Sequence, residues 1–297
     1  MKASYLALIR NHRQLSRVDM SISGARAMKN LSMIYHNALL AQPAENAAMR
    51  RAAFRLRYQV YCLERDFEDV SEFPEAMESD GYDAQARHLL VRTRGCGSIL
   101  GASRLVVDGV SGAAGLPIES HCSRSVSKQL ARVRNAHDTC IAEVSRLAVT
   151  RKLSTITQAN GAGGASTLSS SPSLPRQHLD QDAVATLPAV RSQHVTMGLV
   201  ALLFEQSWSH GVTHWAALLD PALQRFLRRV GIQFHPIGPV IDHRGPRQPV
   251  MATLEDLWSG VKAKGTALAG LVEQLCAPGL SAGQPRAAQY AASCVAH

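Results

Sequence analysis

The chain has 297 residues, of which 46% are hydrophobic and 19% are charged, and its formal net charge is +9. This length and composition can bury one large core or two smaller ones, and they exclude a globally disordered chain. Aromatic residues make up 5% and basic residues are dispersed, which excludes a stacking surface for nucleic acid. No stretch reaches the ~18 uninterrupted apolar residues of a membrane span, so we expect no transmembrane segment.

The spacing of cysteine and histidine residues argues against a metal centre. The six cysteines form no C-x-x-C pair, which is typical of free thiols in a reducing compartment, and we expect a cytoplasmic protein. The apolar stretch after Met1 is too short for the core of a signal peptide. His210 and His214 have H-x-x-x-H spacing, but Gly211 argues against the helix that this spacing needs, so no metal is expected.

Composition divides the chain into a folded domain and three weaker segments. Residues 1–30 mix basic and small residues without a period, and we expect a weakly ordered arm. The folded domain is expected over residues 31–275. Residues 154–190 are rich in Gly, Ser and Pro, which is typical of a flexible insertion, and residues 276–297 have the composition of a disordered tail.

The first half of the domain predicts a helix followed by strands. Apolar residues spaced three and four apart predict an amphipathic helix over residues 44–63, with Arg57 beside the apolar stripe. Residues 66–83 are acidic and lack a period, which predicts a loop, and residues 108–139 are expected to be irregular. The predicted strands are residues 87–93, 98–107 and 140–149, of which the first two form a hairpin through a Gly-bearing turn.

The second half predicts alternating helices and strands. Asp220 as N-cap, Pro221 at the first helical position and Gly231 as terminator delimit the best-defined helix. The other elements are predicted as a helix over 194–208, strands over 214–219 and 232–235, and one or two helices over 254–275. This order predicts an α/β (α+β) domain built on a mixed twisted sheet flanked by helices.

Several charged residues lie inside apolar, strand-like segments. Arg104 lies within residues 98–107, and both Glu143 and Arg146 lie within residues 140–149. Unpaired ions are costly in a low dielectric, so these side chains must be paired or must serve a site. Residues three apart on an ideal strand face opposite sides, so we predict a β-bulge that lets Glu143 and Arg146 face one cleft.

These charges belong to a set of motifs in a fixed order. The motifs are Arg57-Tyr-Gln-Val-Tyr61, Phe67, Glu78-x-Asp80-x-Tyr82-Asp83, Gly101-x-x-Arg104-Leu and Glu143-x-Ser145-Arg146-Leu-x-Val149. The set resembles the signature of acyl-homoserine-lactone synthases and of related N-acyl amino acid synthases. Residues 54–64, the helix that starts at Asp220 and residues 234–239 resemble, more closely still, the acyltransferases associated with the PEP-CTERM and exosortase system. The resemblance covers roughly residues 45–260 without the insertion.

The resemblance implies a GNAT N-acetyltransferase-like fold that passes a fatty acyl group from a thioester to an amine. Such a reaction needs a route for removing the amine proton and donors for the thioester carbonyl. Glu143 is the candidate base, directly or through a water, although it could instead form only a structural bridge with Arg104 or Arg146. The backbone at Leu147 and Ala148 is the candidate donor for the carbonyl.

The remaining candidates bind or orient the substrates. Asp80 and Asp83 either hold the substrate ammonium and the arginines or belong to a solvated acidic loop. Arg57, Arg104 and Arg146 are candidate organisers or carrier contacts. Tyr61 and Phe67 line an acyl or acceptor pocket or belong to the core; they stand where the lactone synthases usually have phenylalanine and tryptophan, respectively.

The donor and the product remain open at the level of sequence. The pyrophosphate loop of coenzyme A transferases, Arg/Gln-x-x-Gly-x-Gly/Ala, has no match after Val149, which favours an acidic acyl carrier protein over coenzyme A as donor, with no cofactor bound. We expect an N-acyl amino acid synthase with a small-molecule amine acceptor. The alternatives are an acyl-homoserine-lactone synthase that uses S-adenosylmethionine and a non-catalytic acyl-binding regulatory domain.

Overall fold

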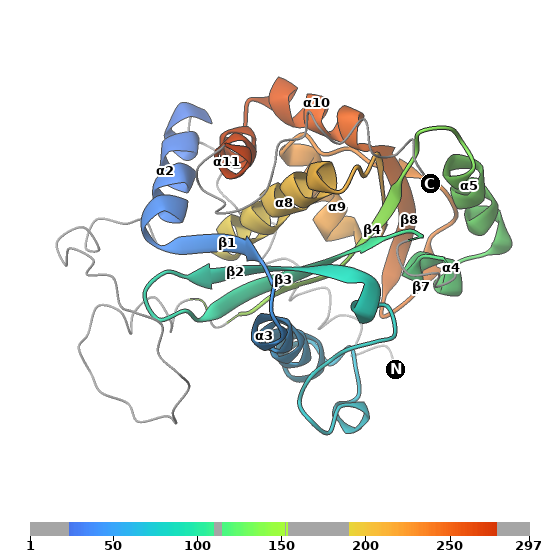
Figure 1. The fold of residues 1–297 in the computed structure, drawn as a ribbon, viewed down its shortest axis with the longest axis horizontal. Helices are drawn as coiled ribbons and strands as arrows, with labels where there is room; N and C mark the ends of the chain where they lie inside the picture. Colours follow the sequence, from blue (N-terminus) through green and yellow to red (C-terminus); the bar gives the residue numbers. More distant parts are fainter. Residues whose placement is uncertain (1–23, 110–114, 152, 154–189, 278–297) are drawn as a thin grey trace, which may run out of the picture.

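A mixed sheet organises the computed structural model, which describes residues 24–109, 115–151, 153 and 190–277. The strand order of this eight-stranded sheet is β1-β2-β3-β4-β5-β8-β6, and β7 pairs with β8 off this path. Among the described strands, β4 and β5 form the parallel pair and the other pairs are antiparallel. The predicted mixed sheet is thus confirmed (Figure 1).

Three antiparallel strands form the first part of the sheet: β1 (Leu39–Pro43), β2 (Ala86–Thr93) and β3 (Ile99–Val107). The β2–β3 hairpin was predicted and is confirmed, with Leu90 opposite Ala102. Both strands have Val- and Leu-rich segments buried on the two faces, which is typical of strands covered on both sides. β1 was not predicted.

Helix α3 (Ala47–Tyr58) covers one face of these strands. The side chain of Asn46 caps it by accepting from the N–H of Met49 (2.9 Å). Its apolar stripe, including Leu56, packs against Leu90, Ala102 and Ala148. The chain continues as a π-helix, η2 (Gln59–Glu64), a form that often occurs at functional sites. The helix predicted over residues 44–63 is therefore confirmed, with a wider last turn.

Strand β4 (Ile141–Val149) lies at the centre of the sheet. It pairs with β3 along most of its length, but it pairs with β5 (His214–Leu219) only over residues 141–143. Beyond Glu143 the two parallel strands separate, while β5 continues to pair with β8 (Pro246–Thr253). The separation leaves one edge of β4 unpaired by strands in the described part of the chain, next to the residues expected to act in catalysis.

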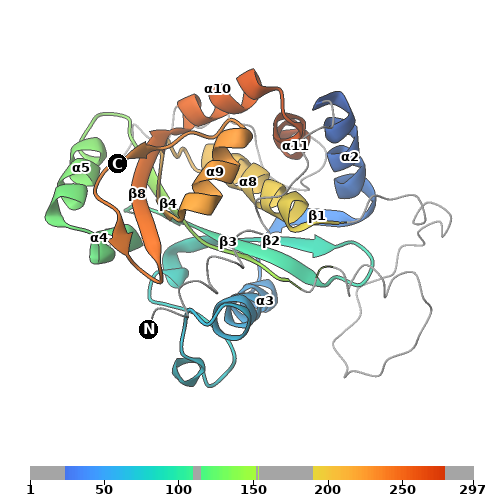
Figure 2. The ribbon, with the colours of Figure 1, turned by 180° about the vertical axis from the view of Figure 1, so that it is seen from behind.

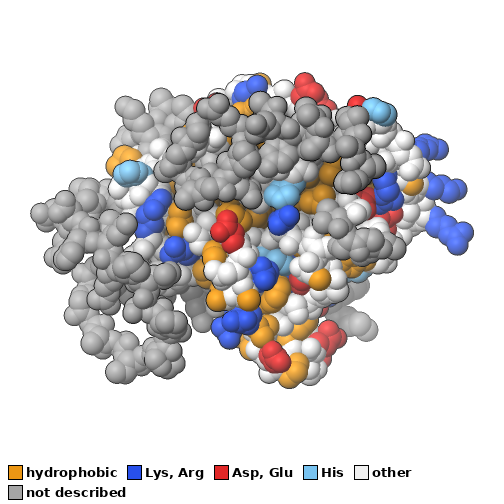
Figure 3. Space-filling view, in the orientation of Figure 1, with side chains coloured by type: hydrophobic (Ala, Val, Ile, Leu, Met, Phe, Trp, Pro, Cys, Tyr) orange, Lys and Arg blue, Asp and Glu red, His pale blue; other side chains and the backbone are white. Residues whose placement is uncertain are grey.

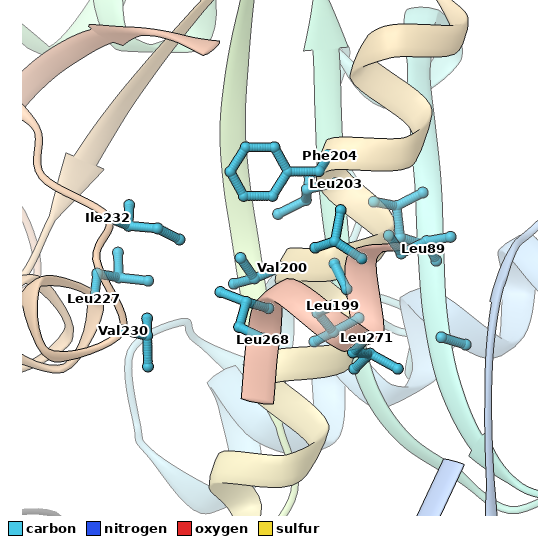
Figure 4. Close-up of a cluster of buried hydrophobic side chains, with 14 of the residues drawn as sticks. Leu89, Leu199, Val200, Leu203, Phe204, Leu227, Val230, Ile232, Leu268 and Leu271 are labelled. Atoms are coloured by element: carbon cyan, nitrogen blue, oxygen red, sulfur yellow. The ribbon is translucent and has the colours of Figure 1, made fainter. Parts of the chain in front are cut away.

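The opposite face of the sheet is covered by helices. Figures 1 and 2 show these helices on the side away from α3, and they are α2 (Gly24–Asn37), α8 (Ser192–Ser209), α9 (Pro221–Arg229), α10 (Leu254–Lys264) and α11 (Ala267–Cys276). Helix α8 lies between the sheet and α11 and is apolar around most of its surface. Its Leu199, Leu203 and Phe204 belong to the largest core cluster (Figure 4).

A close contact fixes α2 against α8. A Cβ atom at Gly198 would lie 1.6 Å from the hydroxyl of Tyr35, which donates a hydrogen bond to the carbonyl of His194 (2.9 Å). Glycine is therefore the residue that lets the buried tyrosine reach this backbone. The contact joins the first described helix to the layer that covers the sheet.

Some predicted boundaries were wrong. Residues 108–139, expected to be irregular, contain the short helix α4 (Pro117–His121) and α5 (Arg124–Arg134). The strand expected over 232–235 is reduced to β6 (His235–Pro236), and the two-residue β7 (Ile241–Asp242) was not predicted. Strand β8 was not predicted either, because its prolines argue against a strand.

Three predicted weak segments lie largely outside the described residues. Helix α2 starts at Gly24, inside the range expected to be an unordered arm, because the arm was judged from composition alone. The predicted insertion at 154–190 and the predicted tail at 276–297 fall almost wholly on residues that the structure does not describe. Within the described ranges, none of the helices is long and apolar enough to span a bilayer.

Candidate active site

Six buried or half-buried charged side chains form a closed ring on the α3 side of the sheet. In order around the ring they are Arg57, Glu78, Arg146, Asp80, Arg104 and Asp83. Arginine and carboxylate alternate, so each carboxylate pairs with two arginines and each arginine with two carboxylates. The ring has no net formal charge. We call it the charge ring.

Arg57 of α3 is one of the most enclosed members, with 1% of its surface exposed. Its Nη1 and Nη2 donate to the two oxygens of Asp83 at 2.7 and 3.0 Å, and its Nε donates to Glu78. Burial alone would lower the pKa of this guanidinium, but the two carboxylates raise it. The bidentate geometry is specific to arginine and fixes α3 against the loop that carries both acids.

The other two arginines come from the central strands. Arg104 of β3 donates to Asp80 (2.5 Å) and Asp83 (2.8 Å) from Nη1 and to the hydroxyl of Ser145 (3.1 Å) from Nε. Arg146 of β4 donates to Glu78 and Asp80, both at 3.0 Å. The ring therefore joins the helix, the loop and two strands. Nη2 of Arg104 is buried without a partner among the described residues, which leaves a donor for a group that enters the site.

Pairing keeps the buried carboxylate of Asp83 ionised. Burial would raise the pKa of Asp83, but hydrogen bonds and charge from Arg57 and Arg104 lower it to about 2. His88 binds the carbonyl of Asp83 through Nε2 (3.0 Å), and burial lowers its pKa, so this imidazole stays neutral. The alternative prediction, that Asp80 and Asp83 belong to a solvated acidic loop, was wrong, since arginines bind both side chains. Glu78 completes the ring although it was not selected as a site residue.

The predicted β-bulge in β4 is confirmed. Ala102 lies opposite Ala148, whereas Arg104 lies opposite Ser145, so β4 holds one residue more than β3 in this interval. Arg146 lies in the bulge with φ of 53°, a conformation that non-glycine residues adopt rarely. Ser145 and Arg146 consequently both face the charge ring, on the side of the sheet that α3 covers.

Glu143 lies on the same face, where β4 leaves β5. It is 3% exposed, and one of its carboxylate oxygens accepts from the N–H of Ile118 in α4 (2.6 Å). It makes no ion pair with any described arginine, so the expected alternative of a direct bridge to Arg104 or Arg146 is not observed. Burial raises its pKa to about 8, against the lowering effect of the Ile118 N–H and of both arginines.

The two candidate backbone donors point in different directions. Thr150 donates to the carbonyl of Leu100 (3.1 Å), and Ala148 lies opposite Ala102. Successive N–H groups of a strand point to opposite sides, so that of Ala148, like that of Thr150, points to β3 and that of Leu147 points to the open edge of β4. The expected pair therefore divides: Leu147 remains a candidate donor, and Ala148 serves the sheet.

Tyr61 and Phe67 form an aromatic wall beside the charge ring. Their rings stack with centroids 6.4 Å apart and an interplanar angle of 26°. Tyr61 lies near Arg146 and Arg57, which act electrostatically on its hydroxyl, although burial dominates and raises its pKa. Phe67 is also covered by Arg247, whose guanidinium carbon lies 5.9 Å from the ring centroid. Both residues thus line the polar region rather than only the core.

A pair of histidines, not recognised in the sequence, lies at the same region. The rings of His121 in α4 and His243 after β7 are 4.1 Å apart between centroids. Arg244 follows directly and binds the carbonyl of Phe67 (2.9 Å) and the carboxylate of Glu68. No sequence spacing indicates this contact, because the partners are far apart in the chain and meet only through the turn after β7.

Other reactive groups are less suited to chemistry. Burial raises the pKa of the Cys62 thiol to about 11, which keeps it protonated and unreactive. No cluster of three metal-binding side chains occurs in the part of the chain that the structure describes. A hollow of about 580 Å³ is lined by Asp80 and Asp83 of the charge ring and also by Arg50, Phe54 and Arg87.

Together these features provide what acyl transfer requires. Glu143 is a buried carboxyl whose raised pKa suits proton transfer near neutral pH. The charge ring holds the surrounding segments rigidly, and the open edge of β4 presents a backbone donor close by.

A comparison with protein-family models finds a match for part of the chain. Residues 56–157 match the model of the acetyltransferase (GNAT) domain. No curated protein sequence matched the chain.

Solved structures similar to the chain share little sequence with it. FeeM, an N-acyl amino acid synthase from uncultured soil microbes, is 16% identical, with 76% of this chain and 96% of that one covered and a TM-score of 0.47. BjaI, a CoA-dependent acyl-homoserine lactone synthase, is 18% identical, with 81% and 100% covered and a TM-score of 0.47. The AHL synthase LasI is 18% identical, with 75% and 96% covered and a TM-score of 0.45.

The motifs that predicted the reaction class, from Arg57 to Val149, lie within the matched residues. Residues 56–157 thus match the model of a GNAT acetyltransferase domain, which agrees with the expected GNAT-like fold.

Proposed function

We propose that the protein is an N-acyltransferase that moves a fatty acyl group from an acyl thioester to the amine of an amino acid or a similar acceptor. The observation that carries this proposal is the position of Glu143. A buried carboxyl of raised pKa, without an ion pair to the described arginines, lies where β4 leaves β5 and beside a ring that has carboxylates for an ammonium group.

The proposed reaction assigns a role to each group. Glu143, in its ionised form, takes a proton from the acceptor ammonium, directly or through one water. The freed amine attacks the thioester carbonyl carbon, so that a C–N bond forms and the C–S bond breaks, and the sulfur leaves as a thiolate that takes up a proton. The N–H of Leu147 on the open edge of β4 donates to the carbonyl oxygen as charge develops there.

The ring and the aromatic wall position the substrates. Asp80 is the most exposed ring carboxylate described, with 27% of its side chain accessible, and it is the member best placed to attract an ammonium. Arg57, Arg104 and Asp83 hold the site together. Tyr61 and Phe67 present an apolar surface to the acyl chain or the acceptor.

We further propose that the acyl donor is carried by an acidic acyl carrier protein, with acyl-coenzyme A as the alternative, and that no cofactor is needed. Helix α5 supports this partner. Its exposed Arg124, Lys128 and Arg132 are four residues apart and form a basic stripe. Figure 3 shows basic side chains gathered at the edge where α5 lies in Figure 1. Such a stripe would attract and orient an acidic partner.

Product analysis tests the proposal. The purified protein is incubated with acyl carrier protein thioesters, acyl-coenzyme A, S-adenosylmethionine and an amino acid mixture, and N-acyl products are sought by mass spectrometry. N-acyl amino acids support the proposal, and an acyl-homoserine lactone would favour the alternative reaction. Acyl binding without any product would favour a regulatory domain. The matched control is Glu143→Gln, which should form product at least about 10²-fold more slowly.

The setting of the reaction is part of the proposal. The resemblance to acyltransferases associated with the PEP-CTERM and exosortase system suggests the same association here. Five cysteines among the described residues are free thiols, which supports action in the cytoplasm.

A further inference from the structure

The stacked histidines His121 and His243 have no role in the proposed proton transfer. Their ring centroids are 4.1 Å apart and the rings are tilted by 34°. They are supplied by two unconnected segments, the end of α4 and the turn between β7 and β8. Two polar rings in contact beside a charged site suggest a binding role.

The hydrogen bond from Arg244 defines the state of His243. Nη1 of Arg244 donates to Nε2 of His243 at 3.1 Å, so Nε2 carries no proton and the proton of the neutral ring is on Nδ1. Burial and the neighbouring His121, Arg244, Arg146 and Arg247 lower the pKa of His243 to about 4. The ring is therefore a neutral N–H donor at neutral pH, in cationic surroundings.

The pair lies close to the base. Helix α4 contacts Glu143 through the N–H of Ile118 (2.6 Å), and His121 is three residues further along the same turn, a rise of about 4.5 Å. Asp80 acts electrostatically on both Glu143 and His121. A ring carboxylate thus lies near both the candidate base and the histidine pair.

Two arginines beside the pair have unusual backbones. Arg146 and Arg244 have φ of 53° and 55°, a left-handed conformation that is strained for a residue with a Cβ atom. Both act on both histidines, and Arg244 is further fixed by Phe67 and Glu68. Strain of this kind persists where the surrounding contacts hold a side chain in a required position.

We propose that His121 and His243 form the subsite for the carboxylate of an amino-acid acceptor, with Arg146 and Arg244 supplying positive charge. The inference rests on the proposed function, which leaves the acceptor open. An α-amino acid bears an ammonium and a carboxylate on one carbon. With the carboxylate at the histidine pair, the ammonium lies between Asp80 and Glu143, where its proton is removed.

The hollow beside the charge ring is the competing place for a carboxylate, because it contains Arg50 and Arg87. It lies against Asp83, whose oxygens are all engaged by Arg57, Arg104 and the N–H of Asp80. Asp80 also lines the hollow, so kinetics must decide between the two places. Arg87→Gln serves as the matched variant for this alternative.

The test compares carboxylate-bearing and carboxylate-free acceptors. Each common α-amino acid and its amide are offered singly to the full chain and to His121→Leu, His243→Leu and the gentler His243→Gln. We expect KM for the amino acid to rise roughly tenfold in the leucine variants, because each loses one hydrogen bond to a charged group. The value of kcat should change little. KM for the amide should not change. His137→Gln, with 90% of that side chain exposed, is the neutral control.

Binding measured by calorimetry keeps the test independent of turnover. If wild-type protein forms no product, the proposed function fails, but amino-acid binding that is lost in both leucine variants still supports the subsite. Three results would overturn the subsite. They are an equal rise in KM for the amino acid and its amide, a rise in KM for the thioester instead of the acceptor, and a loss of amino-acid binding that occurs only in Arg87→Gln. Thermal unfolding of each variant identifies any that fail to fold, and His243→Gln then decides.

Discussion

The two faces of the central sheet are equally buried but are built by different rules. On the α8 side, Leu199 and Phe204 are 0% exposed and pack among other apolar side chains. On the α3 side, Arg57 and Arg104 are 1% exposed, yet each is bound atom by atom in the charge ring. Burying apolar side chains stabilises the fold in proportion to the buried area. The attraction between buried ions, in contrast, seldom outweighs the cost of removing them from water. The comparison separates a face that supplies stability from a face that supplies chemistry.

The largest expected effect is on activity. Glu143→Gln keeps the shape and an acceptor for the Ile118 N–H, but it removes the proton acceptor, so kcat should fall about 10²- to 10⁴-fold. Steady-state kinetics measure the loss, and thermal unfolding should change little. The exposed Glu255→Gln on α10 is the control. Wild-type kcat in Glu143→Gln would remove Glu143 from the mechanism.

The next effect is on stability. Phe204→Ala opens a cavity in the apolar face, and the free energy of unfolding should fall by about 3–5 kcal/mol. Urea denaturation measures it, with Leu63→Ala at a 62% exposed position as the control. At temperatures where the variant remains folded, kcat should match wild type. A large loss of kcat in the folded variant would contradict the division between the two faces.

Arg104→Lys examines the ring without removing its charge. An ammonium cannot reproduce the hydrogen bonds to Asp80, Asp83 and Ser145 together. We therefore expect kcat/KM to fall, by an amount that corresponds to a loss of about 1.5–3 kcal/mol of transition-state stabilisation. Kinetics measure the change, and Arg87→Lys at an exposed position on β2 is the control. If acyl transfer is unaffected, the ring acts only in folding.

The pH dependence follows from the raised pKa of Glu143. Below about pH 8 the carboxyl holds its proton and cannot accept another, so kcat/KM should rise about tenfold per pH unit and level off above that value. Protein stability should change in the opposite direction. Between the ordinary pKa of a glutamate and a pH of about 8, the folded state holds the Glu143 proton and the unfolded state does not, so the free energy of unfolding falls as pH rises through this window. A profile that is flat from pH 6 to pH 9 would contradict the assignment.

The smallest expected effect concerns the donor. Reversing the stripe on α5 by Arg124→Glu, Lys128→Glu and Arg132→Glu should raise KM for the acyl carrier protein about tenfold at low salt, and less at high salt. KM for acyl-coenzyme A should change little. The same reversal of the exposed Arg225, Arg228 and Arg229 on α9 is the control. An equal effect from α9 would assign the attraction to net charge alone.

The sequence predicted the elements whose local signals agree. The helix from Pro221 to Arg229 has an N-cap, an apolar stripe and a terminating glycine, and the structure contains it as predicted. Helix α5 was missed although its apolar Val126, Leu130 and Val133 recur at i, i+4 and i+7, which is helical spacing. Strand β8 was missed because Pro246 and Pro249 oppose a strand locally, while pairing with β5 overrides that preference.

The sequence indicated candidate site residues where charge conflicts with the surrounding apolar pattern. Arg104, Glu143 and Arg146 were visible because ions inside apolar strands need partners, and the bulge at Arg146 followed from strand geometry. Which carboxylate each arginine binds was not predictable, since it depends on how the loop folds back. His121 and His243 were not found because tertiary contact alone brings them together.

The closed form of the charge ring restricts how this sequence can vary. Each carboxylate serves two arginines, so losing Glu78 alone would leave Arg57 and Arg146 short of a counter-ion in a buried setting. Replacement by single steps is therefore costly, and we expect the six positions to be inherited as a block. The apolar positions around Phe204 can exchange one hydrophobic residue for another independently.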